Sequence, residues 1–391
     1  MKRKPVNSSR MPVYRDAGFE LFDAETTKYA FSKETENERI PELYIYSRYR
    51  NPTVVAAEEE IMKLESCNWA LLTQSGMSAI DTAVSVFQHA ESSGPWLFFS
   101  EIYGGTLSYT ESVLRTRRGL QVHSFYPVND KYDLHEFERV IRDINPELIY
   151  VEAISNPMLI VTDIGKVIEL AHKSDSKVLV DNTFATPLLC KPLELGADIV
   201  IHSATKYFSG HGNLTAGVLC GNDSAIMKDA IEYRKYVGHM ISPDDAYRLQ
   251  TQIQTFELRF RKQCQNTLRI VEMLKNHPVI RKVWYPGLPE HPTHSEALKL
   301  FEQRGYGAMV TFDFTGKSDN EKKKKRDSFV QSVSEKIKVI PSLGDPKTIL
   351  MPVESVWGAK YPEPGLIRLS VGFEDSKELE KTIADALMHV E

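Results

Sequence analysis

The chain has 391 residues, of which 42% are hydrophobic and 26% are charged, and its formal net charge is −5. This balance argues against a surface for nucleic acids or other polyanions, and no apolar run of about 18 residues predicts a membrane span. The length is sufficient for two domains with sizeable cores.

The N-terminal residues, the histidines and the cysteines exclude further classes of protein. Residues 1–10 are basic, but no apolar stretch follows them, so they do not predict a secretory signal. The histidines show no spacing typical of a metal site. Widely separated cysteines without a C-x-x-C pair predict reduced thiols in a cytoplasmic protein: Cys67, Cys190, Cys220 and Cys264.

Residues 1–55 lack strong periodicity, which predicts an extended arm instead of a folded unit. Near its end lies the sequence YIYSRYRNPT, which contains Tyr46 and Arg48. An arginine offers phosphate a planar, bidentate donor pair. The plainer alternative is an exposed aromatic and basic loop that turns at Asn51 and Pro52.

A short strand over Trp69–Thr73 and a helix over Ala79–Phe87 are predicted next. Between them lie Ser75, Gly76 and Met77. A strand, a Ser-Gly turn and a helix form a phosphate cradle, because free backbone N–H groups and the positive end of the helix dipole favour an anion. Taken alone the signal is weak, since Ser-Gly is also a common turn.

Two further apolar runs, Trp96–Ser100 and Leu148–Glu152, are typical of buried strands, and polar residues follow each of them. The first leads to Tyr103 in a Y-G-G-T sequence, and the second leads to Asn156 before a proline. The structural alternatives are a core tyrosine at a glycine turn and an ordinary Asn-Pro turn.

The central stretch contains two short apolar runs, Val178–Val180 and Ile199–Ile201, followed by Asp181 and Lys206 respectively. Each run predicts a buried parallel strand that delivers functional groups at its carboxyl end. A lysine amine forms a Schiff base with an aldehyde cofactor, and a carboxylate keeps a pyridine nitrogen protonated. The pair therefore suits pyridoxal phosphate chemistry, whereas a lone lysine is usually a surface residue.

The C-terminal part begins with a long helical tract from about residue 220 and includes a predicted strand over Met309–Phe314. The basic run 322–326 is interpreted as a solvated loop or helix face, because acids flank it. Arg368 lies in the sequence LIRLSVG. An isolated arginine on a strand usually forms a structural ion pair, whereas a bidentate clamp would orient a carboxylate.

The motifs VDNTFATP, GADIVIHSATKY, YIYSRYRNPT, SGMSAI, YGGT and LIRLSVG resemble those of the pyridoxal-phosphate-dependent cysteine/methionine metabolism (trans-sulfuration) family. That family includes cystathionine γ-synthase, cystathionine and methionine γ-lyases, cystathionine β-lyase and O-acylhomoserine sulfhydrylase. The resemblance implies an α/β, fold type I enzyme with a large, mostly parallel sheet domain and a smaller C-terminal α/β domain. It further implies that the chain has three parts: residues 1–55 form an arm that completes a neighbouring subunit's site, 56–235 form the cofactor domain and 236–391 form the C-terminal domain.

The resemblance also assigns roles to individual residues. Lys206, Tyr103 and Asp181 are implied as catalytic, with Tyr103 stacked on the cofactor ring. The implied ligands of pyridoxal 5'-phosphate are Tyr46, Arg48, Ser75, Gly76, Met77, Tyr103, Asn156, Asp181, Thr183, Ser203, Thr205 and Lys206. The implied substrate contacts are Ser342, Leu343 and Arg368. No metal, nucleic acid or membrane partner is expected. The shared site implies a homo-oligomer built from dimers, for which a tetramer is the expected assembly, although the sequence does not decide dimer against tetramer.

The expected reaction is γ-elimination or γ-replacement on a sulfur or homoserine-derived amino acid, of the cystathionine γ-lyase or γ-synthase kind. Alternatives are an O-acylhomoserine sulfhydrylase, a γ-lyase on a non-standard amino acid, and a cofactor-binding regulatory protein without activity. The sequence does not decide which substrate is used, whether the bond breaks at the β- or the γ-carbon, or whether the reaction is an elimination or a replacement. The chain departs from the family's motifs around the substrate at Asn213, Thr251, Pro341 and Trp357.

Overall fold

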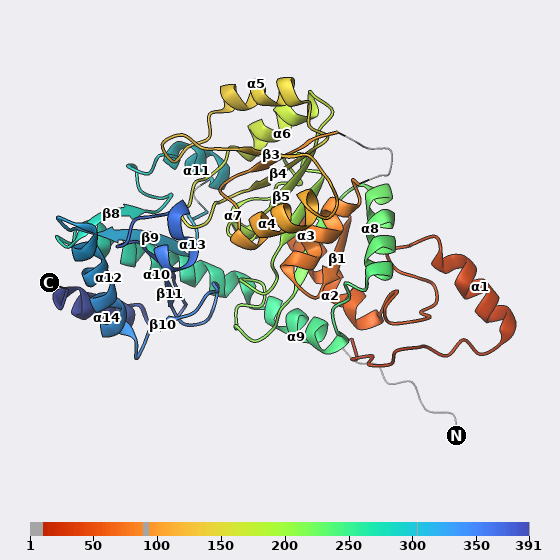
Figure 1. Ribbon diagram of the computed structural model, residues 1–391. Helices are drawn as coiled ribbons and strands as arrows, with labels where there is room; N and C mark the ends of the chain where they lie inside the picture. Colours follow the sequence, from red (N-terminus) through yellow and green to blue (C-terminus); the bar gives the residue numbers. More distant parts are fainter. Residues whose placement is uncertain (1–10, 89–93, 303, 391) are drawn as a thin grey trace.

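A computed structural model describes residues 11–88, 94–302 and 304–390 of the chain. It contains two β-sheets, each covered by helices (Figure 1). The first sheet has seven strands and is mostly parallel, and the second has five strands of mixed direction. This arrangement confirms the predicted α/β fold with a large sheet and a smaller C-terminal sheet.

The seven-stranded sheet has the order β1-β7-β6-β5-β4-β2-β3. Only β7 runs against the other six strands, since it pairs antiparallel with both β1 and β6. Most of its strands are continuous apolar runs because both faces of a parallel sheet are buried under helices. The strands are β1 (Trp69–Thr73), β2 (Trp96–Phe99), β3 (Val122–Phe125), β4 (Leu148–Glu152), β5 (Lys177–Asp181), β6 (Ile199–His202) and β7 (Gly217–Gly221).

Helices cover the large sheet from two sides, with α5 and α6 on one and α3 and α4 on the other (Figure 1). The N-termini of α3, α5 and α6 are capped by short polar side chains, as in α5, where the carboxylate of Asp133 accepts from two backbone N–H groups. The bounds are α2 (Pro52–Glu65), α3 (Gly76–Ser85), α4 (Gly104–Tyr109), the π-helix η1 (Thr110–Arg115), α5 (Leu134–Ile144), α6 (Ile164–His172), α7 (Thr186–Leu189) and α8 (Ser224–Val237).

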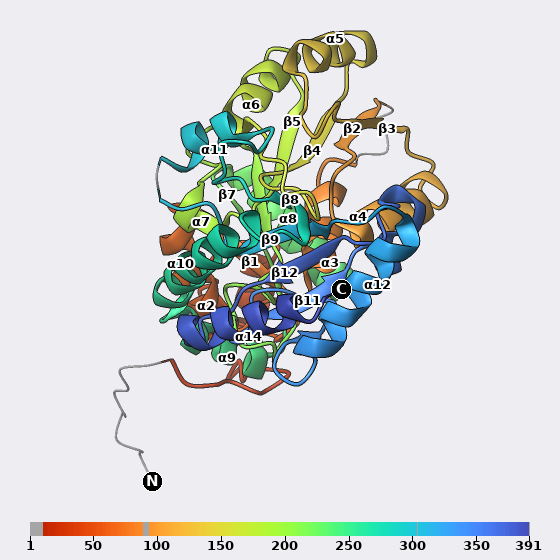
Figure 2. The same ribbon diagram turned by 90° about the vertical axis from the view of Figure 1, so that its left-hand side faces the viewer.

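The smaller sheet has the order β10-β11-β12-β9-β8, and Figure 2 shows α10, α12 and α14 beside it. In the part of the chain that the structure describes, none of the helices combines the length and apolar character needed to cross a membrane. The elements are α9 (Pro243–Ile253), α10 (Phe256–Lys275), β8 (Ile280–Trp284), α11 (His294–Phe301), β9 (Met309–Phe314), α12 (Asp319–Val333), β10 (Lys338–Val339), β11 (Ile349–Pro352), α13 (Glu354–Trp357), the 3-10 helix η2 (Gly358–Lys360), β12 (Ile367–Ser370) and α14 (Ser376–Met388).

The N-terminal arm contains a helix that the sequence did not predict, α1 (Ala24–Glu34), which projects beyond α8 (Figure 1). The expectation of a wholly extended arm was therefore wrong for this segment. Ala30 is the one buried residue of the helix, so an apolar stripe is missing from its sequence. Its ends are defined instead by local capping, because Asp23 accepts a hydrogen bond from the Thr26 N–H.

The basic run 322–326 belongs to α12, and its last residue is not a solvated charge. The Arg326 side chain is buried and donates to Glu354 at 2.8 Å and to the carbonyl oxygen of Pro364 at 2.7 Å. The prediction of a solvated face was thus wrong at this one position. A charge run shows which residues are polar but not which of them meets a partner across the fold.

A buried ion cluster joins the end of the arm to the large domain. Glu58 on α2 is 2.8 Å from Arg50 and 3.1 Å from Arg234 of α8, and all three side chains are buried. Glu58 also accepts a hydrogen bond from the Leu72 N–H of β1 at 3.0 Å. One carboxylate therefore balances two buried guanidinium groups and connects three elements.

Replacing Glu58 by Gln leaves two buried cations without a counter-charge, so we expect a loss of about 3–5 kcal/mol in the free energy of unfolding. Urea unfolding followed by circular dichroism measures this loss. The matched control is Glu60→Gln on the same helix, because Glu60 pairs at the surface with Lys63 and should change stability by less than about 1 kcal/mol. Equal losses in the two variants would contradict this role of the cluster.

Candidate functional site

The carboxyl ends of β5 and β6 bring two of the predicted segments together. Parallel pairing aligns Asp181 with Ile201, so the residues that follow both strands leave the sheet at the same edge. The Asp181 carboxylate accepts from the Thr183 N–H at 2.9 Å, and the Thr183 hydroxyl oxygen accepts from the Ser203 N–H at 2.8 Å. A continuous hydrogen-bonded chain thus links Asp181 to the segment that carries Lys206.

Asp181 has a further hydrogen-bond partner that was not predicted from the sequence. The Tyr150 hydroxyl on β4 donates to its second oxygen at 3.2 Å, so the carboxylate is held from two sides. Burial raises the pKa of Asp181 above its ordinary value, and the bonds from Thr183 and Tyr150 act in the opposite direction. Tyr150 was missed because it reads as one more apolar residue of a buried strand.

The turn between β1 and α3 is a tight glycine cradle. A Cβ atom on Gly76 would lie 3.0 Å from the Ser203 Cβ, and one on Gly217 would lie 2.1 Å from the Ser75 carbonyl oxygen. Only glycine at these positions lets the turn, the β6 end and β7 approach so closely. The first N–H groups of α3, which include those of Gly76 and Met77, have no partner inside the helix and favour an anion.

Two predicted cofactor ligands of this region have structural hydrogen bonds. The Ser75 hydroxyl caps α3 by accepting from the Ser78 N–H at 3.1 Å. The Thr205 hydroxyl donates to the Ala216 carbonyl oxygen at 3.1 Å and accepts from the Ala216 N–H at 2.9 Å. Both residues line the cradle from neighbouring segments, and their hydroxyl oxygens are already engaged within the chain.

Lys206 meets the C-terminal domain directly. Its Nζ atom donates to the Ser342 hydroxyl at 3.0 Å. Burial, assisted by the positive charge of Arg368, lowers the pKa of Lys206 to about 8, while the Asp345 carboxylate opposes that shift. A substantial fraction of the amine is therefore neutral near physiological pH, as a nucleophile or general base requires.

Arg368 on β12 is oriented by two further predicted residues. Its NH1 group donates to the Asn156 side-chain oxygen at 2.9 Å, and its NH2 group donates to the Ser342 carbonyl oxygen at 2.9 Å. The guanidinium is buried, and its Nε has no partner among the described residues. Leu343, the third predicted substrate contact, is also buried. Ser342 thus contacts both Lys206 and Arg368.

Tyr103 lies at the start of α4 with its side chain 51% exposed, so its ring is free of the core. Its backbone N–H donates to the Glu152 carboxylate at 2.6 Å. Burial and the nearby Asp181 charge raise the pKa of Glu152 well above its ordinary value. Glu152 is the last residue of the predicted strand Leu148–Glu152, and its contact with Tyr103 was not predicted.

Tyr46 and Arg48 lie away from the other predicted residues of the same chain. The Arg48 NH1 group donates to the Lys235 carbonyl oxygen at 2.6 Å, and its guanidinium packs on the rings of Tyr46 and Tyr49. The Tyr46 ring is 41% exposed. The described contacts of these two residues include none with Lys206 or Asp181.

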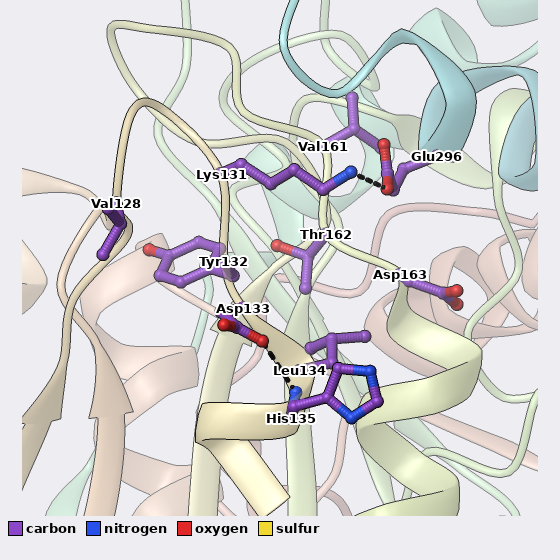
Figure 3. Close-up of a pocket in the computed structure, with 10 residues that line it drawn as sticks. All are labelled: Val128, Lys131, Tyr132, Asp133, Leu134, His135, Val161, Thr162, Asp163 and Glu296. Carbon is purple, nitrogen blue, oxygen red and sulfur yellow. Dashed lines mark hydrogen bonds and ion pairs between the residues drawn. The ribbon is translucent and has the colours of Figure 1, made fainter.

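A separate cavity of about 460 Å³ lies near the starts of α5 and α6 and is lined by none of the predicted site residues (Figure 3). Lys131 and Glu296 form an ion pair of 2.7 Å at its rim. Asp133 caps α5 there by accepting from the His135 N–H. Its charged groups are thus engaged in structural contacts.

The chain is similar to known proteins over nearly its whole length. The family model of Cys/Met metabolism PLP-dependent enzymes matches residues 2–388. An L-methionine gamma-lyase of Porphyromonas gingivalis is 34% identical and covers 96% of this chain and 90% of its own. An O-succinylhomoserine sulfhydrylase of Pseudomonas aeruginosa is 36% identical over 88% of this chain and 83% of its own. The crystal structure of metB from Corynebacterium glutamicum superposes with a TM-score of 0.85 at 29% identity and covers 98% of this chain and 94% of its own.

The chain belongs to the Cys/Met metabolism PLP-dependent enzyme family, and pyridoxal 5'-phosphate is its cofactor. The structure fits this group. The glycine cradle and free N–H groups before α3 suit the phosphate, the buried Asp181 suits the ring nitrogen, and the partly neutral Lys206 suits the aldehyde. These three features lie on adjoining strand ends.

Replacing Lys206 by Ala should abolish the visible absorption band of bound pyridoxal phosphate, because the bond between amine and aldehyde can no longer form. Absorption spectra of the purified protein after gel filtration measure this. The control is Lys177→Ala, which removes an exposed lysine at the other end of β5 and should keep the band. Retention of the band in the Lys206 variant would defeat the assignment.

The rate at which the apoenzyme takes up pyridoxal phosphate should rise with pH through about 8, because the neutral form of Lys206 attacks the aldehyde. Two variants should move the midpoint in opposite directions. Arg368→Gln removes a positive charge and shifts it to higher pH, whereas Asp345→Asn removes a negative charge and shifts it to lower pH. Stopped-flow absorption measures the rate, and shifts of the same sign would contradict this electrostatic origin.

Proposed function

We propose that this chain catalyses γ-elimination or γ-replacement on a sulfur or homoserine-derived amino acid. The observation that carries the proposal is the position of Ser342, which contacts Lys206 through its hydroxyl and Arg368 through its carbonyl oxygen. A general base and a carboxylate clamp are thereby held at a fixed separation. The relatives named above include a γ-lyase and a sulfhydrylase, which supports chemistry at the γ-carbon.

Arg368 binds the α-carboxylate of the substrate in this proposal. Its orientation is fixed before the substrate arrives, because Asn156 and the Ser342 carbonyl oxygen each accept one of its N–H groups. Preorganisation of this kind lowers the entropic cost of placing Cα next to Lys206. Burial of the guanidinium strengthens its attraction for a carboxylate.

Lys206 removes the proton from the substrate Cα and moves protons between Cα and Cβ. Its pKa of about 8 makes the neutral, proton-accepting form far more available near physiological pH than in an ordinary lysine. When bound, pyridoxal phosphate supplies the electron sink that accepts the negative charge left at Cα. Asp181 and the exposed Tyr103 ring would hold that group. Loss of the leaving group at Cγ, with uptake of one water, gives a 2-oxo acid, ammonia and the released thiol or acid; in γ-replacement an incoming thiol takes the place of the leaving group.

The arm completes the site of a neighbouring subunit in this proposal. Arg48 contacts α8 and packs on the Tyr46 ring instead of reaching the Lys206 site of its own chain, and the arm projects outward (Figure 1). A half-buried arginine beside an exposed tyrosine suits a phosphate from a second copy. This role requires a homodimer with shared sites; pairing of dimers into a tetramer and the cytoplasmic location stay predictions.

A second candidate is an O-acylhomoserine sulfhydrylase, which the Pseudomonas aeruginosa relative and the His211-Gly212 sequence support. A γ-lyase on a non-standard amino acid is favoured by the altered positions Thr251, Pro341 and Trp357. A regulatory protein without activity is disfavoured, since the family comprises enzymes and both Lys206 and Arg368 are present.

Purified holoenzyme assayed with methionine, cystathionine and O-acylhomoserine separates these reactions. γ-Elimination of each substrate should give 2-oxobutyrate and ammonia in equal amounts, whereas β-elimination of cystathionine gives pyruvate. The sulfhydrylase candidate predicts homocysteine from O-acylhomoserine and sulfide. Formation of pyruvate from cystathionine without 2-oxobutyrate from any substrate would contradict the proposal.

Replacing Arg368 by Lys should raise KM about tenfold to a hundredfold, because a charge-assisted pair worth about 1.5–3 kcal/mol is weakened. The visible cofactor band should stay, since Arg368 is assigned to substrate and not to cofactor. Arg269→Lys on the exposed face of α10 is the control and should leave KM unchanged. An unchanged KM in the Arg368 variant would show that the α-carboxylate binds elsewhere.

A further inference from the structure

A short segment, which we call the strap, spans Glu354–Tyr361 and connects the C-terminal sheet to the large domain. It consists of α13 and η2 and follows β11 closely. At one end Glu354 pairs with Arg326 at 2.8 Å. At the other end Lys360 donates to the Ser100 carbonyl oxygen at 2.8 Å, and the Tyr361 hydroxyl bonds to Glu101. The partners of these bonds are Arg326 on α12 and the residues that follow β2. The strap is therefore attached to both domains.

Trp357 is the strap residue that faces the candidate site. The Arg368 guanidinium carbon lies over its indole ring, 5.7 Å from the ring centroid. On the other side, a Cβ atom on Gly104 would lie 3.8 Å from the indole Nε1. The indole thus stands between the carboxylate clamp and the turn that immediately follows Tyr103. A substrate held by Arg368 lies within contact distance of this ring.

The charged groups around Trp357 are already paired. Lys360 and Glu101 are 3.3 Å apart, and Glu101 also accepts from Tyr361. Arg368 is committed to the α-carboxylate in the proposed function. The remaining charge beside Lys206 is the Asp345 carboxylate, which would repel a second carboxylate on a substrate. Of the cations that the described contacts bring to this region, Lys360 pairs with Glu101, whereas Arg368 and Lys206 are assigned to the α-carboxylate and to proton transfer in the proposed function. None of these three is left to receive a negatively charged side-chain end.

We propose that Trp357 determines substrate class, selecting amino acids whose side chain ends in an uncharged group, such as an S-alkyl thioether, over those that end in a carboxylate. The inference rests on the proposed binding of the α-carboxylate at Arg368. An apolar end gains contact area on the indole. A carboxylate in the same place loses its hydration without gaining a partner.

Two unreactive amino acids of matched shape test this selection. Norleucine and 2-aminoadipate carry the same three methylene groups and differ in a terminal methyl against a terminal carboxylate. Isothermal titration calorimetry on the holoenzyme should show norleucine binding more tightly by at least about tenfold, the discrimination that small changes give in an apolar pocket. Equal affinities, tighter binding of 2-aminoadipate, or binding of neither compound would overturn the proposal.

Substitutions at Trp357 test whether the indole ring causes this selection between substrates. Trp357→Ala should reduce the affinity ratio to near one, and Trp357→Phe should keep most of it. Val356→Ala, at the exposed neighbouring position of α13, is the matched control and should leave the ratio unchanged. A ratio that survives in the Ala variant would contradict the role of Trp357. Thermal unfolding of each variant checks that the fold is intact.

Different experimental results would contradict the proposed function and this inference. If no substrate of the panel yields 2-oxobutyrate or a γ-replacement product but the affinity ratio follows Trp357, the reaction is wrong and the selection stands. If 2-oxobutyrate forms but the ratio is the same in wild type and Trp357→Ala, the reaction stands and the selection is wrong. Among substrates, the inference predicts a higher kcat/KM for methionine than for cystathionine.

Discussion

The alignment of strand ends along one edge of the large sheet is the constraint on which the candidate site depends. β1, β4, β5 and β6 all run in the same direction, so the turns that follow them meet at that edge. The phosphate cradle, Asn156, Asp181 and Lys206 each follow one of these strands. Because the strands are buried on both faces, a slip in their register would move all of these groups relative to one another.

Burial sets the chemistry of these groups once the sheet has placed them. Loss of solvent lowers the pKa of Lys206 and raises that of Asp181, and the neighbouring charges of Arg368 and Asp345 adjust Lys206 in opposite directions. The C-terminal domain contributes Ser342, Arg368 and the strap. In the proposed function, the contact between Lys206 and Ser342 joins cofactor chemistry from one sheet to substrate recognition from the other.

The sequence was sufficient to predict those elements that depend on a local pattern of apolar and polar residues. The strands Trp69–Thr73 and Met309–Phe314 agree with the structure, because an apolar run can be recognised within a few residues. The helix α1 could not be predicted, since it has hardly any buried face. Tyr150, Glu152 and the buried Arg326 were likewise missed, because their partners lie far away in the chain.

The most direct test of the account is chemical identification of the residue that carries the cofactor. Reduction of the holoenzyme with sodium borohydride fixes the bond between amine and aldehyde, and mass spectrometry of proteolytic peptides then locates the added mass. The account predicts one pyridoxyl phosphate per chain on the peptide that contains Lys206. Labelling of another lysine, or of none, would contradict it.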